Sequence, residues 1–182
     1  MVYQIVPLGD EKGLFIEDME DTEPFAGYYK GEPIEVPKTR ARLIYRRQKV
    51  RKPDFLLGIQ VFPVVSRKFR SVVESVEPES VQFIPVAVVC RETGAADSNY
   101  AFMNILGNLE AFDWQRSTYT EMTGVKAVLE AEKICLRRQS VGTRQIFRVD
   151  GILTELFVGS RMRQALEAAE VTGFIMTPVE CF

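Results

Sequence analysis

Two stretches of this chain carry the same apolar pattern at a constant offset of 93 residues, from Phe69 to Met162. In each stretch, four apolar residues stand at positions i, i+3, i+4 and i+7, which places them on one face of a helix. They are Phe69, Val72, Val73 and Val76 in the first stretch, and Met162, Ala165, Leu166 and Ala169 in the second. The pattern therefore predicts two amphipathic helices.

The residues around these helices predict where each one begins and ends. Ser66 and Ser160 are candidate N-caps, because a serine hydroxyl can accept hydrogen bonds from the first free amides of a helix. Glu77-Pro78 and Thr172-Gly173 are expected to end the two helices, since neither proline nor glycine continues a helix well.

Apolar segments flank both helices and complete two strand–helix–strand units. The flanking segments are 61–65 and 81–86 in the first unit, and 154–158 and 174–179 in the second. Pro85 and Pro178 hold the same place in the later strands, and each should mark an edge, a bulge or a strand end, because proline cannot donate to a ladder. A duplicated unit and a chance convergence of two amphipathic helices both explain the match, and the sequence leaves the two open.

Other apolar runs predict strands outside the two units. Gly107-Asn108 would form the turn of a type II′ hairpin or a bulge within one strand, and Asp150-Gly151 offers a tight turn. Residues 125–132 fit a helix or a strand, and Leu43 to Tyr45 fits a strand with protective edge charges. The remaining candidate strands are Val2 to Leu8, Gly13 to Ile16, Tyr100 to Leu106, Leu109 to Trp114, Ser117 to Met122 and Gln145 to Val149.

The fold class that follows is α+β, with a mostly antiparallel or mixed β-sheet and two amphipathic helices packed on it. The 182 residues lie within the range of one domain, 1–182, with an irregular N-terminal lobe over 1–53 and a core over 54–182. The aromatic residues Phe25, Tyr28 and Tyr29 of the lobe are expected to anchor it on the core, the alternative being exposed contacts for a partner.

The residue types needed for catalysis are poorly represented. The chain has no histidine, which removes the usual general base at neutral pH and the commonest metal ligand. No CxxC spacing and no glycine-rich phosphate loop occurs. Asp113 to Ser117 is expected to be a turn closed by side-chain hydrogen bonds rather than a catalytic loop, and Trp114 a core anchor. We expect no enzyme, no catalytic residue, no cofactor and no metal.

The cysteines and the chain start indicate a compartment. Cys90, Cys135 and Cys181 are odd in number and far apart, which fits a reducing environment rather than a disulfide framework. The first residues lack the basic and apolar regions of a signal peptide, and no run approaches the roughly 18 apolar residues of a membrane span. We expect a cytoplasmic protein without a membrane partner, and its oligomeric state stays open.

Charge is unevenly distributed, although the formal net charge is -2. Acidic residues dominate from Asp10 to Glu35, and the segment 38–52 is basic without any acidic residue. The near-neutral total and the sparse aromatic residues do not favour nucleic acid as the partner. The preferred interpretation of the basic segment is a solvated edge, or a strip complementary to the acidic segment before it.

Most of the chain after residue 52 is similar to a known family. The similar segments are Pro53 to Phe55, Pro63 to Ser66, Val81 to Val86, Tyr100 to Leu106, Phe112-Asp113, Ser117, Ile146 to Val149, Leu156 to Val158 and Val171 to Phe174, with a fainter Tyr28 to Pro33. They resemble a bacterial family of immunity proteins of polymorphic-toxin systems, formerly a domain of unknown function named after a myxobacterial member. These motifs are strand edges, caps and turns, so the resemblance transfers no functional residue.

The resemblance implies a protein that binds and neutralises a cognate bacterial toxin by covering its surface. Such an inhibitor needs complementary shape and charge but no reactive centre. The alternative is a regulatory or scaffold module that binds a host protein or nucleic acid through the basic segment 38–52. An acidic patch could plug the positive cleft of a toxin that acts on nucleic acid or nucleotides. The residues of our hypothetical partner-binding patch are Glu17, Asp18, Glu20, Asp21 and Glu23.

Overall fold

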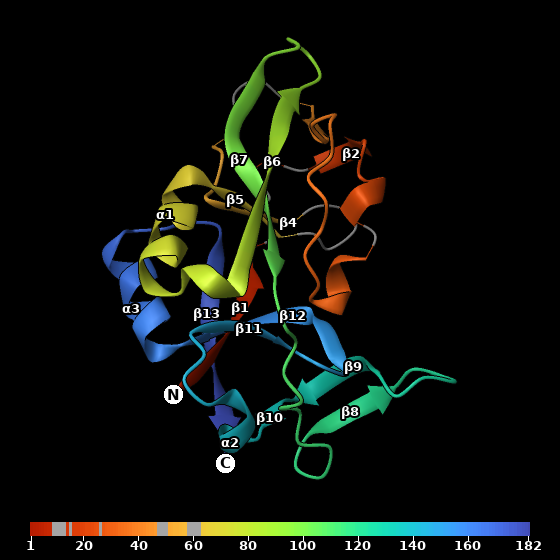
Figure 1. The fold of residues 1–182 in the computed structure, drawn as a ribbon, viewed down its shortest axis with the longest axis vertical. Helices are drawn as coiled ribbons and strands as arrows, with labels where there is room; N and C mark the ends of the chain where they lie inside the picture. The colour runs from red at the N-terminus through yellow and green to blue at the C-terminus, as the bar shows by residue number, and fades with distance from the viewer. Residues whose placement is uncertain (9–13, 15, 26, 47–50, 58–62) are drawn as a thin grey trace.

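The computed structural model describes residues 1–8, 14, 16–25, 27–46, 51–57 and 63–182, whose strands form two larger sheets and a separate hairpin (Figure 1). The upper sheet of Figure 1 has the order β2-β3-β6-β7-β5-β4, and β3 and β6 are its parallel neighbours. Its strands are β2 (Ile16–Glu20), β3 (Arg42–Tyr45), β4 (Phe55–Leu57), β5 (Pro63–Ser66), β6 (Val81–Cys90) and β7 (Ala96–Ile105).

The lower sheet has the order β10-β13-β1-β12-β11 and is antiparallel apart from the short β10–β13 pair. Its central strand is β1, so the first residues of the chain complete this sheet. Its strands are β1 (Val2–Pro7), β10 (Cys135–Leu136), β11 (Ile146–Val149), β12 (Ile152–Gly159) and β13 (Phe174–Cys181).

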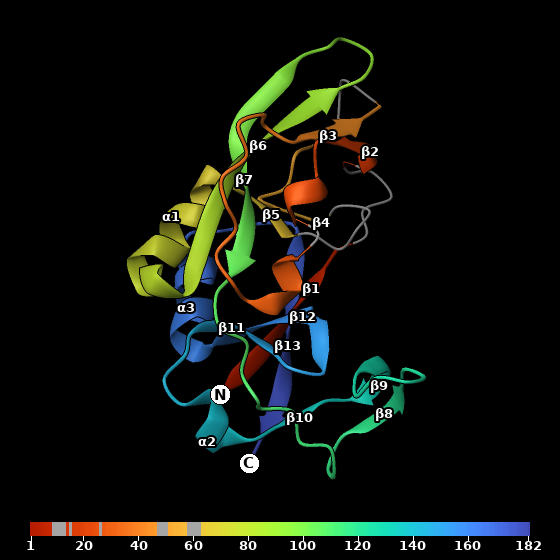
Figure 2. The ribbon, with the colours of Figure 1, turned by 45° about the vertical axis from the view of Figure 1, so that its right-hand side comes forward.

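The remaining elements are helices and an isolated hairpin. The hairpin, which we call the arm, projects away from both sheets in Figures 1 and 2. None of the helices in the described residues has the length and apolar character that a membrane crossing requires. The elements are α1 (Arg67–Val76), α2 (Arg138–Val141), α3 (Ser160–Ala168), the 3-10 turns η1 (Glu23–Phe25), η2 (Tyr28–Lys30) and η3 (Pro78–Ser80), and the arm strands β8 (Thr118–Glu121) and β9 (Val128–Lys133).

This arrangement, mostly β with mixed and antiparallel sheets and a few helices, agrees in broad outline with the predicted α+β class. The two strand–helix–strand units are also present, as β5-α1-β6 and β12-α3-β13. In each unit an antiparallel strand, β7 or β1, is inserted between the two strands, which therefore run parallel to each other. The two units thus share one topology.

The helices of the two units bury their apolar faces in the same pattern. Phe69 and Val73 of α1 are buried, as are Met162 and Leu166 at the corresponding positions of α3. The other stripe residues of both helices are partly buried. The two helices contact each other and lie on the same side of both sheets in Figure 1. One core cluster therefore joins both helices to both sheets, and its apolar burial is the main term that holds the units together.

The helix starts are capped in two different ways. Ser66 is the N-cap of α1, as predicted, and its hydroxyl accepts a hydrogen bond from the amide of Phe69. The predicted cap Ser160 is wrong, because this residue already lies in the first turn of α3 and its hydroxyl donates to the carbonyl of Met1. The cap position is Gly159, and the Oε1 atom of Gln145 accepts hydrogen bonds from the amides of Arg161 and Met162 instead.

The helix ends also differ from each other. α1 ends at Val76 before Glu77-Pro78, as predicted. The predicted end of α3 at Thr172-Gly173 is wrong, because the helix ends at Ala168. Glu170 adopts a left-handed φ of 51°, and the amide of Val171 then bonds back to the carbonyl of Leu166. This closure satisfies a free carbonyl of the last turn and stops the helix earlier.

Pro85 and Pro178 occupy equivalent local edges. Pro85 pairs with Ala101 of β7, and β3 joins the other side of β6 only from Ala87 onward. Pro178 pairs with Tyr3 of β1, and β10 joins the other side of β13 only from residue 180 onward. The edge predicted from the missing proline amides is therefore confirmed at both positions.

Three predictions about strands and their turns are wrong. Gly107-Asn108 forms neither a hairpin turn nor a bulge, because the amide of Gly107 and the side-chain amide of Asn108 donate to the carbonyls of Gly31 and Tyr29. The strand predicted over Leu109 to Trp114 is also absent: these residues leave β7 and cross to the lower sheet, where Leu109 forms only an isolated bridge with Val149. Residues 43–45 lie in β3, which is paired on both sides by β2 and β6 and is no edge strand.

Other predicted strands agree with the structure. Residues 117–122 contain β8, the ambiguous segment 125–132 contains most of β9, and β11 and β12 meet at the Asp150-Gly151 turn.

In the lobe, Phe25 and Tyr28 are buried as predicted, whereas Tyr29 is 44% exposed. Of the segment 13–16, residues 13 and 15 lie outside the described residues, as do residues 61 and 62.

Candidate functional site

The described residues contain no group of three side chains suited to hold a metal ion. Burial raises the pKa of the Cys135 and Cys181 thiols, whereas a hydrogen bond from the Thr93 side chain lowers the pKa of Cys90. Cys90 is only 1% exposed, so its sulfur is not available at the surface. None of the three thiols is therefore both exposed and lowered in pKa.

The loop after β7 is structural, as predicted. One carboxylate oxygen of Asp113 accepts hydrogen bonds from the amides of Gln115 and Arg116, and the amide of Ser117 closes the turn on the Asp113 carbonyl. Trp114 packs on the rings of Phe112 and Tyr119, with centroid distances of 4.7 and 5.3 Å. The loop thus contacts the arm through Trp114 and Tyr119, which lies in the first strand of the arm.

Three of the five hypothetical partner-binding residues are engaged by arginines of the chain itself. Glu17 forms ion pairs with Arg46 at 3.0 Å and with Arg91 at 3.4 Å. Asp18 also pairs with Arg91. These contacts tie the acidic strand β2 to its neighbours in the upper sheet.

The third engaged residue is Glu20, which pairs with Arg42 of the adjacent strand. Asp21 and Glu23 are exposed and form no ion pair within the described residues. The uncompensated charge of the five therefore comes mainly from these two residues.

The basic segment 38–52 is complementary to acidic residues of the chain, as the preferred interpretation predicted. Arg42 and Arg46 pair with the acidic strand, and Nζ of Lys52 lies 2.9 Å from a carboxylate oxygen of Asp97. Residues 47–50, which include Arg47 and Lys49, lie outside the described residues. These pairs reduce the free positive charge that a polyanion would need.

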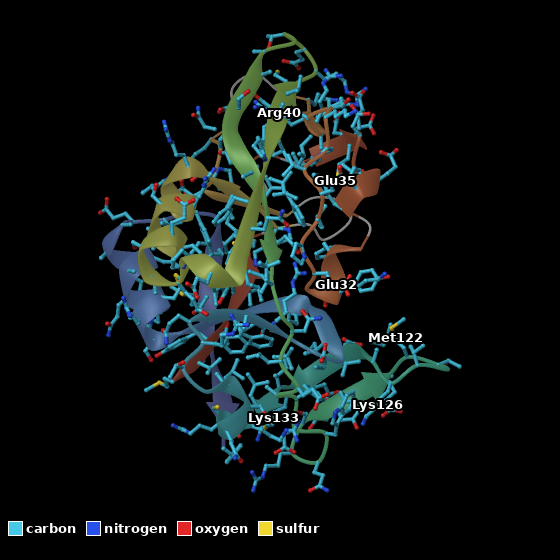
Figure 3. All side chains as sticks on the ribbon, in the orientation of Figure 1. Glu32, Glu35, Arg40, Met122, Lys126 and Lys133 are labelled. Atoms are coloured by element: carbon cyan, nitrogen blue, oxygen red, sulfur yellow. The ribbon has the colours of Figure 1, made fainter. Side chains whose placement is uncertain are left out.

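The segment 21–36 and the arm both carry exposed side chains, and both segments lie on the right-hand side of the molecule in Figure 1. Figure 3 shows Glu32 and Glu35 of the lobe above Met122 of the arm on that side. We call this surface the contact face. Its residues are the exposed acids Asp21, Glu23, Glu32 and Glu35 and the exposed apolar residues Tyr29, Val36, Met122, Val125 and Leu129.

The arm presents apolar side chains on a rigid base. Met122, Val125 and Leu129 are 44%, 56% and 66% exposed. The amide of Val128 donates to the carbonyl of Gly151, which ties β9 to the turn between β11 and β12. The Trp114 ring fills the space beside Gly151, where an added Cβ would meet the Cζ2 carbon of the ring at 2.7 Å. An exposed apolar tip on a fixed base is typical of a surface that meets a partner.

Sequence reasoning did not identify the arm as a functional element. The sequence predicted a strand over 117–122 and left 125–132 open between a helix and a strand, and the apolar residues of both segments resemble ordinary core positions in one sequence. Only the fold shows that β8 and β9 pair with each other alone and that the described residues add no third strand to them.

Comparison with protein families assigns the chain. The sequence model of the immunity protein family (Imm11) matches residues 8–180 of the 182. The chain belongs to the Imm11 immunity protein family. A comparison with curated proteins found no match. The match to Imm11 covers the upper sheet, both strand–helix–strand units, the arm and the strands of the lower sheet other than β1, and it confirms the resemblance to immunity proteins that the sequence motifs indicated.

Proposed function

We propose that this Imm11 protein binds one cognate bacterial toxin and neutralises it by covering the toxin's surface, without chemical turnover. The observation that carries the proposal is the family match over residues 8–180. The described residues add a surface with exposed apolar and acidic groups. We further propose that it acts in the cytoplasm of a bacterium that carries a polymorphic-toxin system.

We propose the contact face as the surface that meets the toxin. Interfaces draw most of their energy from a few aromatic and apolar anchors, surrounded by polar groups that set orientation and association rate. Tyr29 and the arm residues would supply the anchors, and the surrounding acids would favour a basic toxin surface. We propose that Asp21 and Glu23 of the hypothetical patch Glu17, Asp18, Glu20, Asp21 and Glu23 act within this face, and that the other three residues extend it.

The ion pairs divide this acidic patch into two classes. Asp21 and Glu23 would carry most of the attraction, because Glu17, Asp18 and Glu20 are already compensated by arginines. Neutralising only Asp21 and Glu23 should therefore weaken toxin binding nearly as much as neutralising all five. Unchanged affinity of the five-residue variant would remove the patch from the interface while leaving the proposed function in place.

The test of the function is co-expression in bacteria with the protein encoded beside this chain. We expect the neighbour alone to arrest growth, and the pair to grow and to co-purify as a stable complex. Growth arrest that persists when both proteins accumulate in soluble form would contradict the proposed function.

A further inference from the structure

A hollow on the upper sheet is lined by three arginines. Its volume is about 310 Å³, close to the lower limit of roughly 300 Å³ for small-molecule sites. Arg67 and Arg70 come from α1, and Arg40 comes from the segment before β3. Figure 3 shows Arg40 beside the upper part of β6 and β7. No carboxylate is among the described residues that line the hollow.

Two of these three cations have no ion-pair partner within the described residues. Arg40 and Arg67 are exposed and form none of the ion pairs there. Arg70 shares its charge with Glu74 at 2.7 Å and lies over the ring of Phe83. The hollow therefore keeps an excess of positive charge.

The nearest acidic side chain in the sequence, Asp97, is engaged elsewhere. Burial opposes its ionisation, but hydrogen bonds from Lys52 and Asn99 lower its pKa below the usual value. The same carboxylate holds the Asn99 side chain, which lines the hollow, by a hydrogen bond of 2.9 Å. Asp97 thus orients a neutral polar group of the hollow while its charge is balanced by Lys52.

The floor of the hollow is apolar and flat. Val65, Ala101 and Pro85 pair across β5, β7 and β6 in one row, and all three line the hollow. Val65 and Ala101 are buried, whereas Pro85 is exposed, so Pro85 presents most of the accessible apolar surface of this floor. A charged rim over an apolar floor suits a ligand with an oxyanion at one end and an organic group at the other.

We propose that this hollow binds a small organic phosphate, with its phosphate group held by Arg40, Arg67 and Arg70 and its organic part on the floor. Guanidinium forks donate paired hydrogen bonds to phosphate oxygens, and three of them match a dianion better than the single charge of a carboxylate. This inference is independent of the toxin-binding proposal.

The test is titration of the full chain with phenyl phosphate, inorganic phosphate and benzoate, followed by amide chemical shifts and calorimetry. We expect saturable binding with phenyl phosphate tightest, and shifts confined to Ser98 to Ala101 and the first turn of α1. Inorganic phosphate should bind more weakly because it leaves the floor empty, and benzoate because it carries one charge.

Three variants and one matched control locate the site. Arg40→Gln, Arg67→Gln and Arg70→Gln should each weaken phenyl phosphate binding by about 10-fold, the loss expected for a charged hydrogen-bond donor. Arg163→Gln is the control, because Arg163 sits 93 residues after Arg70, pairs with Glu167 at 2.7 Å and lies over the ring of Tyr3. It should bind as tightly as the unmodified chain. No saturable binding, or equal losses in all four variants, would overturn the proposal.

Discussion

The guanidinium carbon of Arg148 lies 4.3 Å from the ring centroid of Tyr28, and its Nη1 atom donates a hydrogen bond of 3.2 Å to the Tyr28 carbonyl. Arg148 belongs to β11 of the lower sheet, whereas Tyr28 belongs to the N-terminal lobe. Burial lowers the pKa of Arg148 to about 10, which still leaves it charged at neutral pH. This buried cation thus helps to fix the turn η2, and with it Tyr29 of the contact face, on the lower sheet, beside the hydrogen bonds that the carbonyls of Tyr29 and Gly31 accept.

This geometry predicts an order of stability among Arg148 variants. Arg148→Lys should destabilise the fold by about 2 kcal/mol or more, because an ammonium cannot stack on the ring and reach the carbonyl at once. Arg148→Met should lower the free energy of unfolding by less than Arg148→Lys does, since it removes the buried charge together with its contacts. Urea denaturation measures both. A lysine variant as stable as the unmodified chain would show that the stacking contributes nothing.

The cap of α3 yields a second prediction. Gln145→Ala should lower the free energy of unfolding by about 1 kcal/mol, the usual contribution of a side chain that caps a helix start. Ser160→Ala is the control and should change it by much less, because Ser160 makes only an exposed bond to Met1. A larger loss of unfolding free energy for Ser160→Ala than for Gln145→Ala, measured by thermal or urea unfolding, would show that Ser160 caps α3.

Tyr100 gives the chain a specific dependence on alkaline pH. Burial, with smaller effects of Asp97 and Asp54, raises its pKa well above the ordinary value of 10.0, and its hydroxyl donates to the Pro53 carbonyl at 2.8 Å. The folded state therefore holds this proton more tightly than the unfolded state does. The resulting stability is fully present below pH 10 and is lost as the pH rises above it.

The variant Tyr100→Phe isolates that contribution. It should be less stable than the unmodified chain by about 1 kcal/mol at neutral pH, through loss of the hydrogen bond. Above the ordinary tyrosine pKa, the stability of the variant should fall less steeply with pH than that of the unmodified chain. The plots of unfolding free energy against pH for the two proteins should therefore converge. Parallel curves in urea denaturation across this pH range would contradict the assignment.

The arm gives a prediction about recognition. Changing Met122, Val125 and Leu129 to serine should leave stability nearly unchanged, because these side chains are exposed, and should weaken toxin binding by about 10-fold or more. Ile175→Ser, which alters an apolar residue of β13 that is 51% exposed, is the matched control. Equal affinity of the arm variant and the control would place the interface elsewhere.

Sequence patterns predicted those elements of this fold that depend on residues close to one another in the chain. The helical stripes and the proline positions follow from spacing and from a missing amide, so both units could be predicted around Phe69 and Met162. The cap of α3 could not, because Gln145 lies far before Ser160 in the sequence and reaches it only through the β11–β12 pairing. Gly107 likewise looked like a turn, but its amide bonds to Gly31 of the lobe.

The candidate site was predictable only in part. The acidic density from Glu17 to Glu23 was visible in the sequence, but its compensation by Arg46 and Arg91 depends on the strand order β2-β3-β6. The contact face joins residues 21–36 to residues 122–129, and no spacing rule connects segments so far apart. Interfaces of this kind are set by tertiary structure rather than by a motif.

The most direct test of the central claim is a titration of the purified toxin's activity with this purified chain. Inhibition by stoichiometric surface binding predicts that activity falls linearly and ends at equimolar amounts, and that it returns when the two intact proteins are separated. Silencing of the toxin by far less than an equimolar amount, or a toxin that stays inactive and chemically altered after separation, would contradict the account.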